Sequence, residues 1–458
     1  MIRHNLFTSN FKRNLKRLLG IIAAGILFLS VCRILNFLYV EDDERARIMW
    51  HNFYEQDGNI DYICVGSSHV FNGVVPEILD QKTGENYYNM ATTGQRLRES
   101  YFIIKEASHR NQLKGVYLDL YFLISMEGMG NYDNFAAISG GWENLDYRKV
   151  SLDRLETFFQ LNPSEYYVSA ALPFTRFREH LCDVEWIYAM QKSKKRPEYQ
   201  NYQYQWESEN DKAKYTEKGY FYHTLQMENP YLHLDSVPNS MRMTGEAEEY
   251  LRKIIEYCQK EGIEIILFQT PVYEVETIAY ERYDDYTGGV RAVAEEYQVP
   301  YYDFNLTKEE FFPVQEMRYF VDMGHLNGEG AALFTNFFCD VVKGTQEENE
   351  ELFYKSFQEK LVSEDAQAIG MYYREGTQEE LLRGEIGNDM YRVTIASNRQ
   401  EGVLYQIYLT PEGGETVMVQ DFSENKSFDI PMEEHGVCKI VWHESNDAGN
   451  DKAIEVGY

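Results

Sequence analysis

Short apolar runs alternate with amphipathic stretches from about residue 60 onward. Apolar runs that end in Gly, Pro or polar residues predict strands, and apolar spacing near 3.6 residues predicts helices. The expected strands are residues 60–66, 87–91, 113–123, 263–271 and 299–305. The expected helices are residues 76–84, 96–109, 245–262, 288–298 and 328–342. Strands that alternate with helices predict an α/β fold, a mainly parallel sheet covered on both faces.

Residues 126–240 interrupt this rhythm with a segment rich in Tyr, Trp, Asn and charge. They predict an inserted helical and loop region near the strand ends, where open α/β sheets bind their ligands. Its aromatic side chains either stack on sugar rings or cover apolar surface with their hydroxyls in water, and the second is the commoner role.

The pattern changes again after a charged stretch near residues 343–352. Residues 352–458 contain short alternating runs typical of strands, separated by turns such as 411–415. They predict a small β-sandwich-like domain at the C-terminus. Ligand binding, partner docking and structural support all remain open as its role.

The N-terminus carries a basic segment, residues 1–17, followed by an apolar segment, residues 18–40. The apolar segment is long enough to span a bilayer core of about 30 Å as a helix. Its basic flank favours a cytoplasmic N-terminus, which places residues 41–345 and the β-rich domain outside the cell membrane. A cleaved signal peptide is the alternative, but no small-x-small cleavage site ends the run, so an uncleaved single-pass anchor is favoured.

The charge and the cysteines narrow the function classes. A formal net charge of −30 argues against nonspecific electrostatic capture by nucleic acid or by an anionic membrane surface, although local basic patches are compatible with it. The six cysteines have neither CxxC nor metal-like spacing. They exclude a disulfide scaffold, leave one disulfide open, and suggest no metal site.

Gly-Ser-Ser-His, residues 66–69, directly follows the first expected strand. A serine nucleophile needs a histidine base and an acid that orients it, and Asp322 and His325 lie three residues apart before the last expected helix. Gly94, just after the second strand, can bring a backbone N–H close to a developing oxyanion. Each motif alone is most often a turn or a helix cap. In this order, the three predict a catalytic site built on Ser68.

These motifs resemble blocks I, II and V of the SGNH (GDSL-like) hydrolase superfamily, over about residues 60–342. The resemblance implies a flavodoxin-like three-layer α/β core. It also implies that Ser68 is the nucleophile, His325 the base and Asp322 the orienting acid. The backbone N–H groups of Gly94 and Ser68 would form the oxyanion hole.

The chain departs from the family pattern at two places. Ser67 stands where the common first block has Asp, and the third block with its asparagine donor is not visible. Asn89 or Gln95 are candidate replacements for that donor at the substrate. His69 follows the paired serines and either contacts substrate or caps the next turn.

The N-terminal anchor makes the chain similar to a membrane-anchored branch of the superfamily. That branch includes the D-alanyl-transfer protein of teichoic acid modification and the alginate O-acetylation proteins. These relatives move acyl groups on or near cell-surface polymers, usually beside a membrane-bound O-acyltransferase.

The resemblance implies serine-dependent acyl transfer or ester hydrolysis on a surface or exported carbohydrate polymer, without a metal or nucleotide cofactor and without a nucleic-acid partner. The other hypothesis is a non-catalytic accessory or scaffold protein that binds a polymer or a membrane partner. The missing third block favours the scaffold, whereas the intact Ser68, Asp322 and His325 favour the enzyme.

Overall fold

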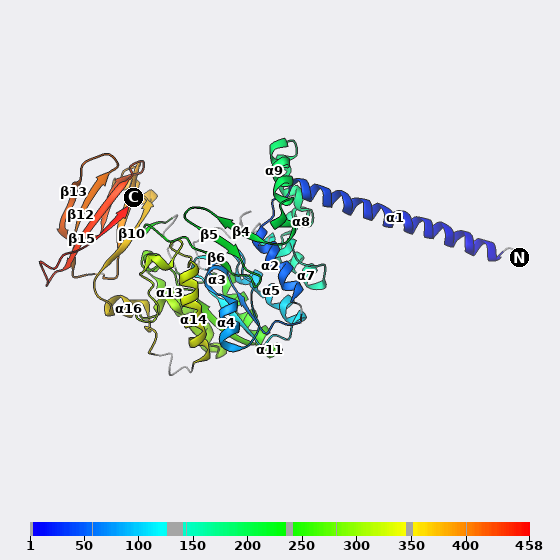
Figure 1. The fold of residues 1–458 in the computed structure, drawn as a ribbon, viewed down its shortest axis with the longest axis horizontal. Coiled ribbons are helices and arrows are strands. Elements are labelled where there is room, and N and C mark those ends of the chain that lie inside the picture. Colours follow the sequence, from blue (N-terminus) through cyan, green and yellow to red (C-terminus); the bar gives the residue numbers. More distant parts are fainter. Residues whose placement is uncertain are drawn as a thin grey trace. The chain divides into compact units, whose positions relative to one another are not determined.

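The computed structural model describes two units of the chain (Figure 1). One combines Met1–Ile48 with Trp142–Tyr204, and the other combines Met49–Gly141 with Gln205–Tyr458. The described residues are 3–56, 58–125, 141–142, 144–234, 241–280, 282–344, 351–399 and 401–458. Parts of the expected insertion, residues 126–140 and 235–240, therefore lie outside the described residues.

A five-stranded parallel sheet forms the centre of the second unit. Its strands are β1 (Tyr62–Val65), β2 (Tyr87–Asn89), β3 (Gly115–Asp119), β8 (Glu264–Gln269) and β9 (Tyr301–Asp303). Their order in the sheet is β2-β1-β3-β8-β9. The chain adds β2 on one side of β1 and then adds β3, β8 and β9 on the other side, so the order of addition reverses between β1 and β3. In a doubly wound sheet, the carboxyl ends of the strands at such a reversal form the ligand crevice.

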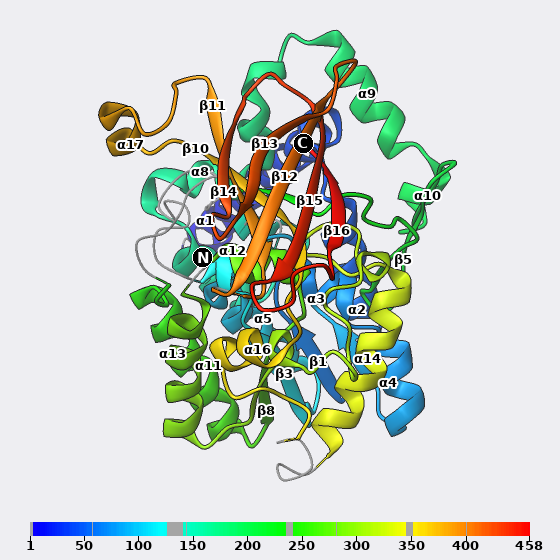
Figure 2. The ribbon, with the colours of Figure 1, turned by 90° about the vertical axis from the view of Figure 1, so that its left-hand side faces the viewer.

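Helices cover both faces of this sheet, which explains why its central strands are apolar throughout. The helices are α3 (Ser68–Gly73), α4 (Pro76–Thr83), α5 (Leu97–Arg110), α11 (Gly245–Glu261), α12 (Glu274–Ala279), α13 (Tyr283–Tyr297) and α14 (Gly328–Lys343). In Figure 2, β1, β3 and β8 lie between α11 and α13 on one side and α4 and α14 on the other. The expected α/β architecture is thus confirmed.

Local sequence signals set the ends of several helices. The side chain of Thr244 accepts a hydrogen bond from the N–H of Ala247 and caps α11, which ends at Gly262 with φ +72°. The expected helix at 288–298 is part of the longer α13, which begins at Tyr283. Two glycines, Gly288 and Gly289, lie inside α13, and they hid its first two turns from the sequence pattern.

Part of the expected insertion consists of strands rather than helices and loops. A three-stranded sheet is formed by β4 (Tyr204–Glu207), β5 (Lys212–Tyr215) and β6 (Phe221–His223). A further strand, β7 (Tyr231–His233), pairs in parallel with a strand of the C-terminal domain.

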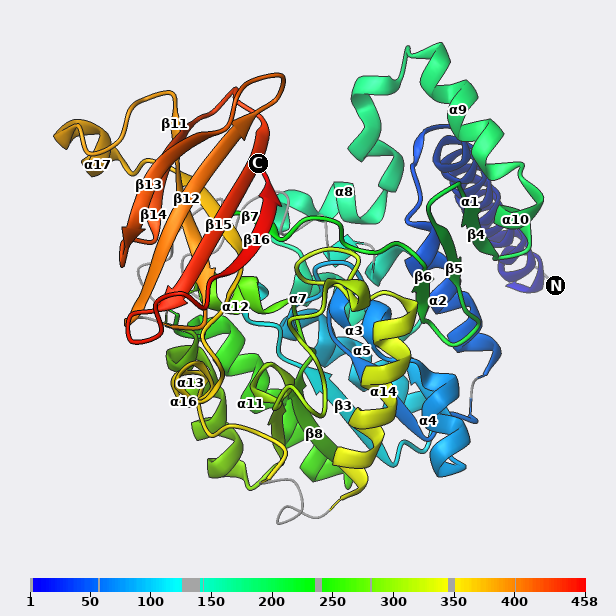
Figure 3. The same ribbon diagram turned by 60° about the vertical axis from the view of Figure 1, so that its left-hand side comes forward.

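The C-terminal domain is a sandwich of two four-stranded sheets (Figure 3). One sheet has the order β14-β11-β10-β7, and the other has the order β13-β12-β15-β16. The strands are β10 (Ala368–Glu375), β11 (Met390–Ser397), β12 (Val403–Pro411), β13 (Val417–Ser423), β14 (Ser427–Pro431), β15 (Gly436–Glu444) and β16 (Lys452–Gly457). Because β7 completes the first sheet, the domain is not confined to the expected residues 352–458. Two short helices, α16 (Phe357–Ser363) and α17 (Gln378–Arg383), precede and interrupt its strands.

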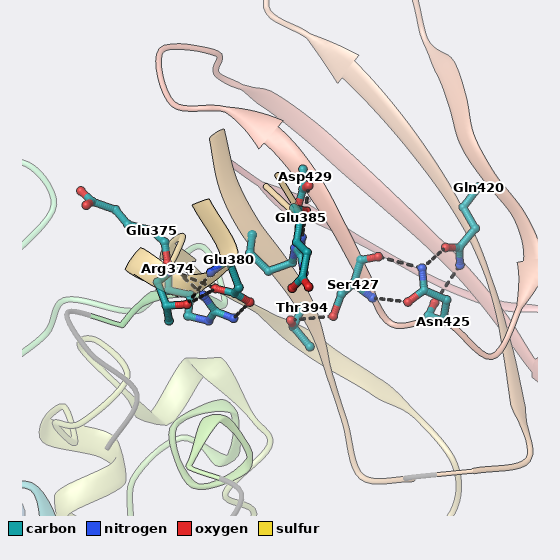
Figure 4. Close-up of polar contacts among 11 residues, drawn as sticks. Arg374, Glu375, Glu380, Glu385, Thr394, Gln420, Asn425, Ser427 and Asp429 are labelled. Atoms are coloured by element: carbon teal, nitrogen blue, oxygen red, sulfur yellow. Dashed lines mark hydrogen bonds and ion pairs between the residues drawn. The ribbon is translucent and has the colours of Figure 1, made fainter. Parts of the chain in front are cut away.

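Alternation along the strands separates an apolar core from a polar outer face in this domain. Met371, Val393, Tyr405 and Ile440 are among the buried residues of the core. Figure 4 shows polar contacts elsewhere in the domain, such as the paired hydrogen bonds from Arg374 to the carboxylate of Glu380, at 2.7 and 2.8 Å.

The first unit joins the N-terminal helix to the helices of the insertion. It contains α1 (Arg3–Tyr39), the start of α2 (Glu44–Glu55), α7 (Leu152–Leu161), α8 (Tyr167–Ala171), the 3-10 helix η3 (Pro173–His180), α9 (Val184–Lys194) and α10 (Pro197–Gln200). The segment Arg13–Tyr39 of α1 spans 27 residues and contains an 18-residue window with a mean hydropathy of 2.4, so it is long and apolar enough to cross a membrane. All six cysteines fall within the described residues and are free thiols.

Candidate active site

The first motif forms a tight turn at the carboxyl end of β1. Gly66 packs against the next strand so closely that a Cβ there would lie 2.7 Å from the Cβ of Asp119. Ser68 follows as the first residue of α3, so its N–H has no partner within that helix. Ser67 is 1% exposed, whereas Ser68 is only partly buried. Ser68 is therefore the hydroxyl of the pair that an incoming molecule can reach.

Ser68, His325 and Asp322 form a continuous chain of hydrogen bonds. The Oγ of Ser68 lies 2.8 Å from Nε2 of His325. On the other side of the ring, Nδ1 lies 2.9 and 3.0 Å from the two carboxylate oxygens of Asp322. These are the distances and the order of contacts that an activated serine requires. The structure thus brings together the three residues expected to carry the chemistry.

The loop that carries Asp322 and His325 is held by its own backbone. Oδ1 of Asp322 accepts hydrogen bonds from the N–H groups of Gly324 and His325, both at 2.9 Å. Asn327 caps α14 by accepting from the N–H groups of Glu329 and Gly330, and this fixes where the loop meets the helix. These hydrogen bonds fix the backbone before and after His325 and so set the orientation of its imidazole.

These bonds also set the protonation state of Asp322. Desolvation by the surrounding protein would by itself raise the pKa of this carboxyl. The hydrogen bonds and charge of His325, with the N–H of Gly324, outweigh burial and lower the pKa below its ordinary value. Asp322 is therefore a carboxylate at neutral pH, which is the form that can hold an imidazolium.

Gly94 lies in the turn that follows β2, beside the turn of the first motif. The N–H of Thr92 donates to the carbonyl of Gly66 at 3.3 Å and ties the two turns together. Gly94 has φ +57°, a conformation that favours glycine. Among the described residues, none accepts a hydrogen bond from its N–H. Gly94 and Ser68 thus both present backbone donors at this end of the sheet.

Asn89 and Gln95 serve the protein rather than a substrate, which corrects the expectation for both. Nδ2 of Asn89 donates to the carbonyls of Val70 and Val74, so neither amide hydrogen is free. Gln95 is 3% exposed. It accepts from the hydroxyl of Thr92 at 2.9 Å and braces the turn that carries Gly94. No third oxyanion donor comes from these two side chains.

His69 lies behind the catalytic histidine and is 4% exposed. Its ring stacks on His325 with 4.6 Å between ring centroids, and on Tyr121 with 3.5 Å. Its Nδ1 lies 3.0 Å from the hydroxyl of Ser67. This burial argues against the expected substrate contact. Within the described residues neither ring nitrogen bonds a backbone group, so His69 does not cap the next turn either.

Tyr121 and Glu276 complete this cluster, and the sequence motifs did not include either residue. The hydroxyl of Tyr121 donates to Oε1 of Glu276. Within the described residues, Oε2 of Glu276 and Nε2 of His69 have no hydrogen-bond partner. A Cβ on Gly324 would lie 3.3 and 2.9 Å from these two atoms. The sequence offered one signal for these two residues, their position: Tyr121 and Glu276 follow β3 and β8 at the carboxyl edge of the sheet, where ligands bind.

Burial shifts the pKa values of Glu276 and His69 in opposite directions, because it favours the neutral form of each side chain. It raises the pKa of Glu276 to about 7, although the hydroxyl of Tyr121 and the charge of His325 lower it. Burial and then the charge of His325 lower the pKa of His69 well below its ordinary value. His69 is consequently neutral at pH 7, whereas Glu276 gains or loses a proton near that pH.

Comparison with known proteins assigns this chain to no family. No protein-family model and no curated protein matches it. Among solved structures, the chain is compared with an endo-β-1,4-mannanase double mutant of Cellulomonas fimi, at 9% identity over 92% of this chain and 98% of that one. The TM-score is 0.14, so this likeness supports no statement about fold or activity.

Proposed function

We propose that the protein is a serine esterase or O-acyltransferase of the SGNH type. The observation that carries the proposal is the unbroken chain of hydrogen bonds from Ser68 through His325 to Asp322. The reversal of strand order between β1 and β3 supports it, because Ser68 follows β1 at the edge where doubly wound sheets bind ligands. The order of the five strands is also that of a flavodoxin-like core.

In the proposed reaction, Oγ of Ser68 attacks the carbonyl carbon of an ester while Nε2 of His325 takes the hydroxyl proton. The carbonyl electrons move to oxygen, and the N–H groups of Ser68 and Gly94 stabilise this oxyanion. When the oxyanion collapses, the ester C–O bond breaks and the leaving alcohol takes the proton from His325. An acyl-Ser68 remains.

The second half reverses these steps with a new hydroxyl. The acceptor gives its proton to Nε2 of His325 and attacks the acyl carbon, and Oγ of Ser68 leaves and recovers a proton. Water as acceptor gives hydrolysis, whereas a sugar hydroxyl gives transfer. Asp322 holds the N–H of His325 in the required tautomer and stabilises the imidazolium.

We assign the substrate to the acyl esters of a surface or exported carbohydrate polymer. The motifs of residues 66–69, Gly94 and 322–330 support this through their resemblance to SGNH proteins. The apolar α1 supports a place at the cell membrane, with a cytoplasmic N-terminus and the remaining chain outside. A membrane-bound O-acyltransferase is then the proposed acyl donor or partner.

A non-catalytic scaffold is the second candidate, and the end of β3 favours it. Asp119 there accepts hydrogen bonds from Thr270, and Tyr121 is buried against His69. Among the described residues at this place, none corresponds to the asparagine donor of the family's third block. A scaffold would retain the fold while its serine stayed inert.

Acylation of the full-length protein distinguishes the two candidates. We would mix the detergent-solubilised chain with p-nitrophenyl acetate and follow nitrophenol release together with the intact mass. The enzyme is expected to release nitrophenol in a burst and to carry one acetyl group on the peptide that contains Ser68. A folded protein that gains no acyl group from this ester or from an acylated polymer would contradict the proposal.

Replacing Glu276 by Gln should change the pH dependence of turnover. The raised pKa keeps Glu276 protonated below about pH 7, so the wild type and the Glu276→Gln variant are both neutral there and should react alike. Above pH 7 the wild type gains a negative charge that stabilises the imidazolium of His325 in the transition state. We expect the variant to be about fivefold slower at pH 8.5 and equal to the wild type at pH 5.5.

Tyr121→Phe provides the matching test. The hydroxyl of Tyr121 lowers the pKa of Glu276, so its loss should move the pH at which turnover changes upward. Profiles of kcat/KM between pH 5 and 9 measure both effects. A uniform loss at every pH in both variants would mean that the cluster only supports the fold.

A further inference from the structure

Large apolar side chains are exposed on the helices that the insertion contributes to the first unit. On α7, Leu152, Leu155 and Phe159 are 84%, 52% and 53% exposed, and their spacing of three and seven residues places them on one face. Val184 and Tyr188 on α9 are 76% and 68% exposed, four residues apart. We propose that these two faces, here called the apolar faces of α7 and α9, rest on the lipid surface at the outer end of α1.

The contacts of α9 and η3 with α1 place these helices at one end of the membrane-spanning candidate (Figure 1). The indole N–H of Trp186 donates to the carbonyl of Tyr39 at 3.0 Å. Nζ of Lys194 donates to the carbonyl of Asn36 at 3.0 Å, and the N–H of Phe174 donates to the side chain of Asn36 at 3.1 Å. The insertion is therefore fastened to the last turns of α1.

The length of α1 determines how deep these contacts lie. At 1.5 Å per residue, the stretch from Leu18 to Tyr39 is about 33 Å long, close to the bilayer core of about 30 Å. If α1 spans the bilayer, as the proposed function holds, Asn36 and Tyr39 lie at the outer interface. The helices bonded to them then lie at the same depth, so the inference depends on that anchor.

The charge of residues 142–204, the part of the insertion that belongs to the first unit, fits a lipid surface, although that of the whole chain does not. Residues 142–204 contain nine Lys and Arg against nine Asp and Glu, while the full chain carries a net charge of −30. A neutral segment is not repelled by anionic lipid headgroups, whereas the negatively charged remainder of the chain would be repelled by them. Tyr39, Trp186 and Tyr188 gather at this level, where amphipathic aromatic rings favour the membrane interface. Lipid is thus the occupant that charge and side-chain type both favour.

A fluorescent probe on the native Cys182 tests this in the full-length chain. Cys182 is exposed between the apolar Leu181 and Val184, and Cys32→Ala removes the other accessible thiol. The labelled protein would be reconstituted in phosphatidylcholine vesicles with and without a quencher on the acyl chain. We expect blue-shifted emission and about twofold quenching. The Val184→Asp/Tyr188→Asp double variant should abolish both effects, and Glu185→Gln should not.

Two further labelled positions separate this inference from the anchor itself. A probe at Ile26→Cys in the middle of α1 should be quenched, and one at Lys260→Cys on α11 should not. If Ile26 is quenched while Cys182 behaves like Lys260, the lipid surface is wrong and the anchor stands. If Ile26 is not quenched, the anchor fails and this inference fails with it. A Cys182 probe that is shielded only in native membranes would overturn lipid as the occupant and indicate a membrane protein instead.

Discussion

The Ser68→Ala variant is expected to lose at least about 10⁴-fold in kcat and all labelling by a fluorophosphonate. The Oγ of Ser68 is the atom that lies 2.8 Å from Nε2 of His325, and alanine removes it without changing the backbone of α3. Turnover of p-nitrophenyl acetate by the full-length protein and in-gel detection of the probe measure the two losses. Thermal unfolding should show the variant folded, since Ser68 is only partly buried.

Ser67→Ala is the matched control, one residue away in the same turn. Its hydroxyl contacts Nδ1 of His69 rather than the catalytic histidine, so we expect less than about a tenfold loss and intact labelling. Labelling that survives in Ser68→Ala but vanishes in Ser67→Ala would show that the nucleophile was assigned to the wrong serine.

The Asp322→Asn variant should lower kcat by about 10³- to 10⁴-fold while leaving KM within a few-fold. The carboxylate accepts from the ring of His325 and from two backbone N–H groups, whereas an amide can donate to the ring and stabilise the wrong tautomer. Steady-state kinetics on the same ester at pH 8 would measure the change.

The pH dependence of the free energy of unfolding tests the role of the same carboxylate in the wild type. Because the pKa of Asp322 is lowered in the folded protein, the carboxylate stabilises the fold above its unfolded pKa of 3.8, and that contribution is lost as the pH falls through the lowered value. Glu276 has the opposite sign: its raised pKa makes the fold lose stability as the pH rises from about 4.5 to 7. Urea unfolding of Asp322→Asn should therefore differ from the wild type least at the lowest pH. In the kinetic measurement, an Asp322→Asn variant that retains more than a tenth of the wild-type kcat would contradict the role of Asp322.

The local pattern of the chain was sufficient to predict the elements that carry the site. Apolar runs bounded by glycine marked β1 and β2, and the apolar spacing of residues 328–342 marked α14. These signals depend on spacing within a few residues, which hydrophobic periodicity and helix caps report directly. The residues of the triad were found in the same way, because each stands next to such a boundary.

The same pattern was insufficient where distant segments meet. Residues Tyr121 and Glu276 come from different strands' ends and touch only after β3 and β8 pair, and no spacing along the chain relates them. The strand β7 joins the C-terminal sandwich from more than a hundred residues upstream, so the alternation in residues 352–458 could not include it.

Residue types and their spacing along the chain establish which side chains could act: a serine after a strand, an Asp and a His before a helix, and a glycine in a turn. Which of them act together depends on how the distant segments pack. Packing buried His69, Asn89 and Gln95 and left Ser68 accessible to His325, 257 residues away. The chemical type of a side chain is local, whereas its burial and its hydrogen-bond partners depend on contacts between elements far apart in the chain.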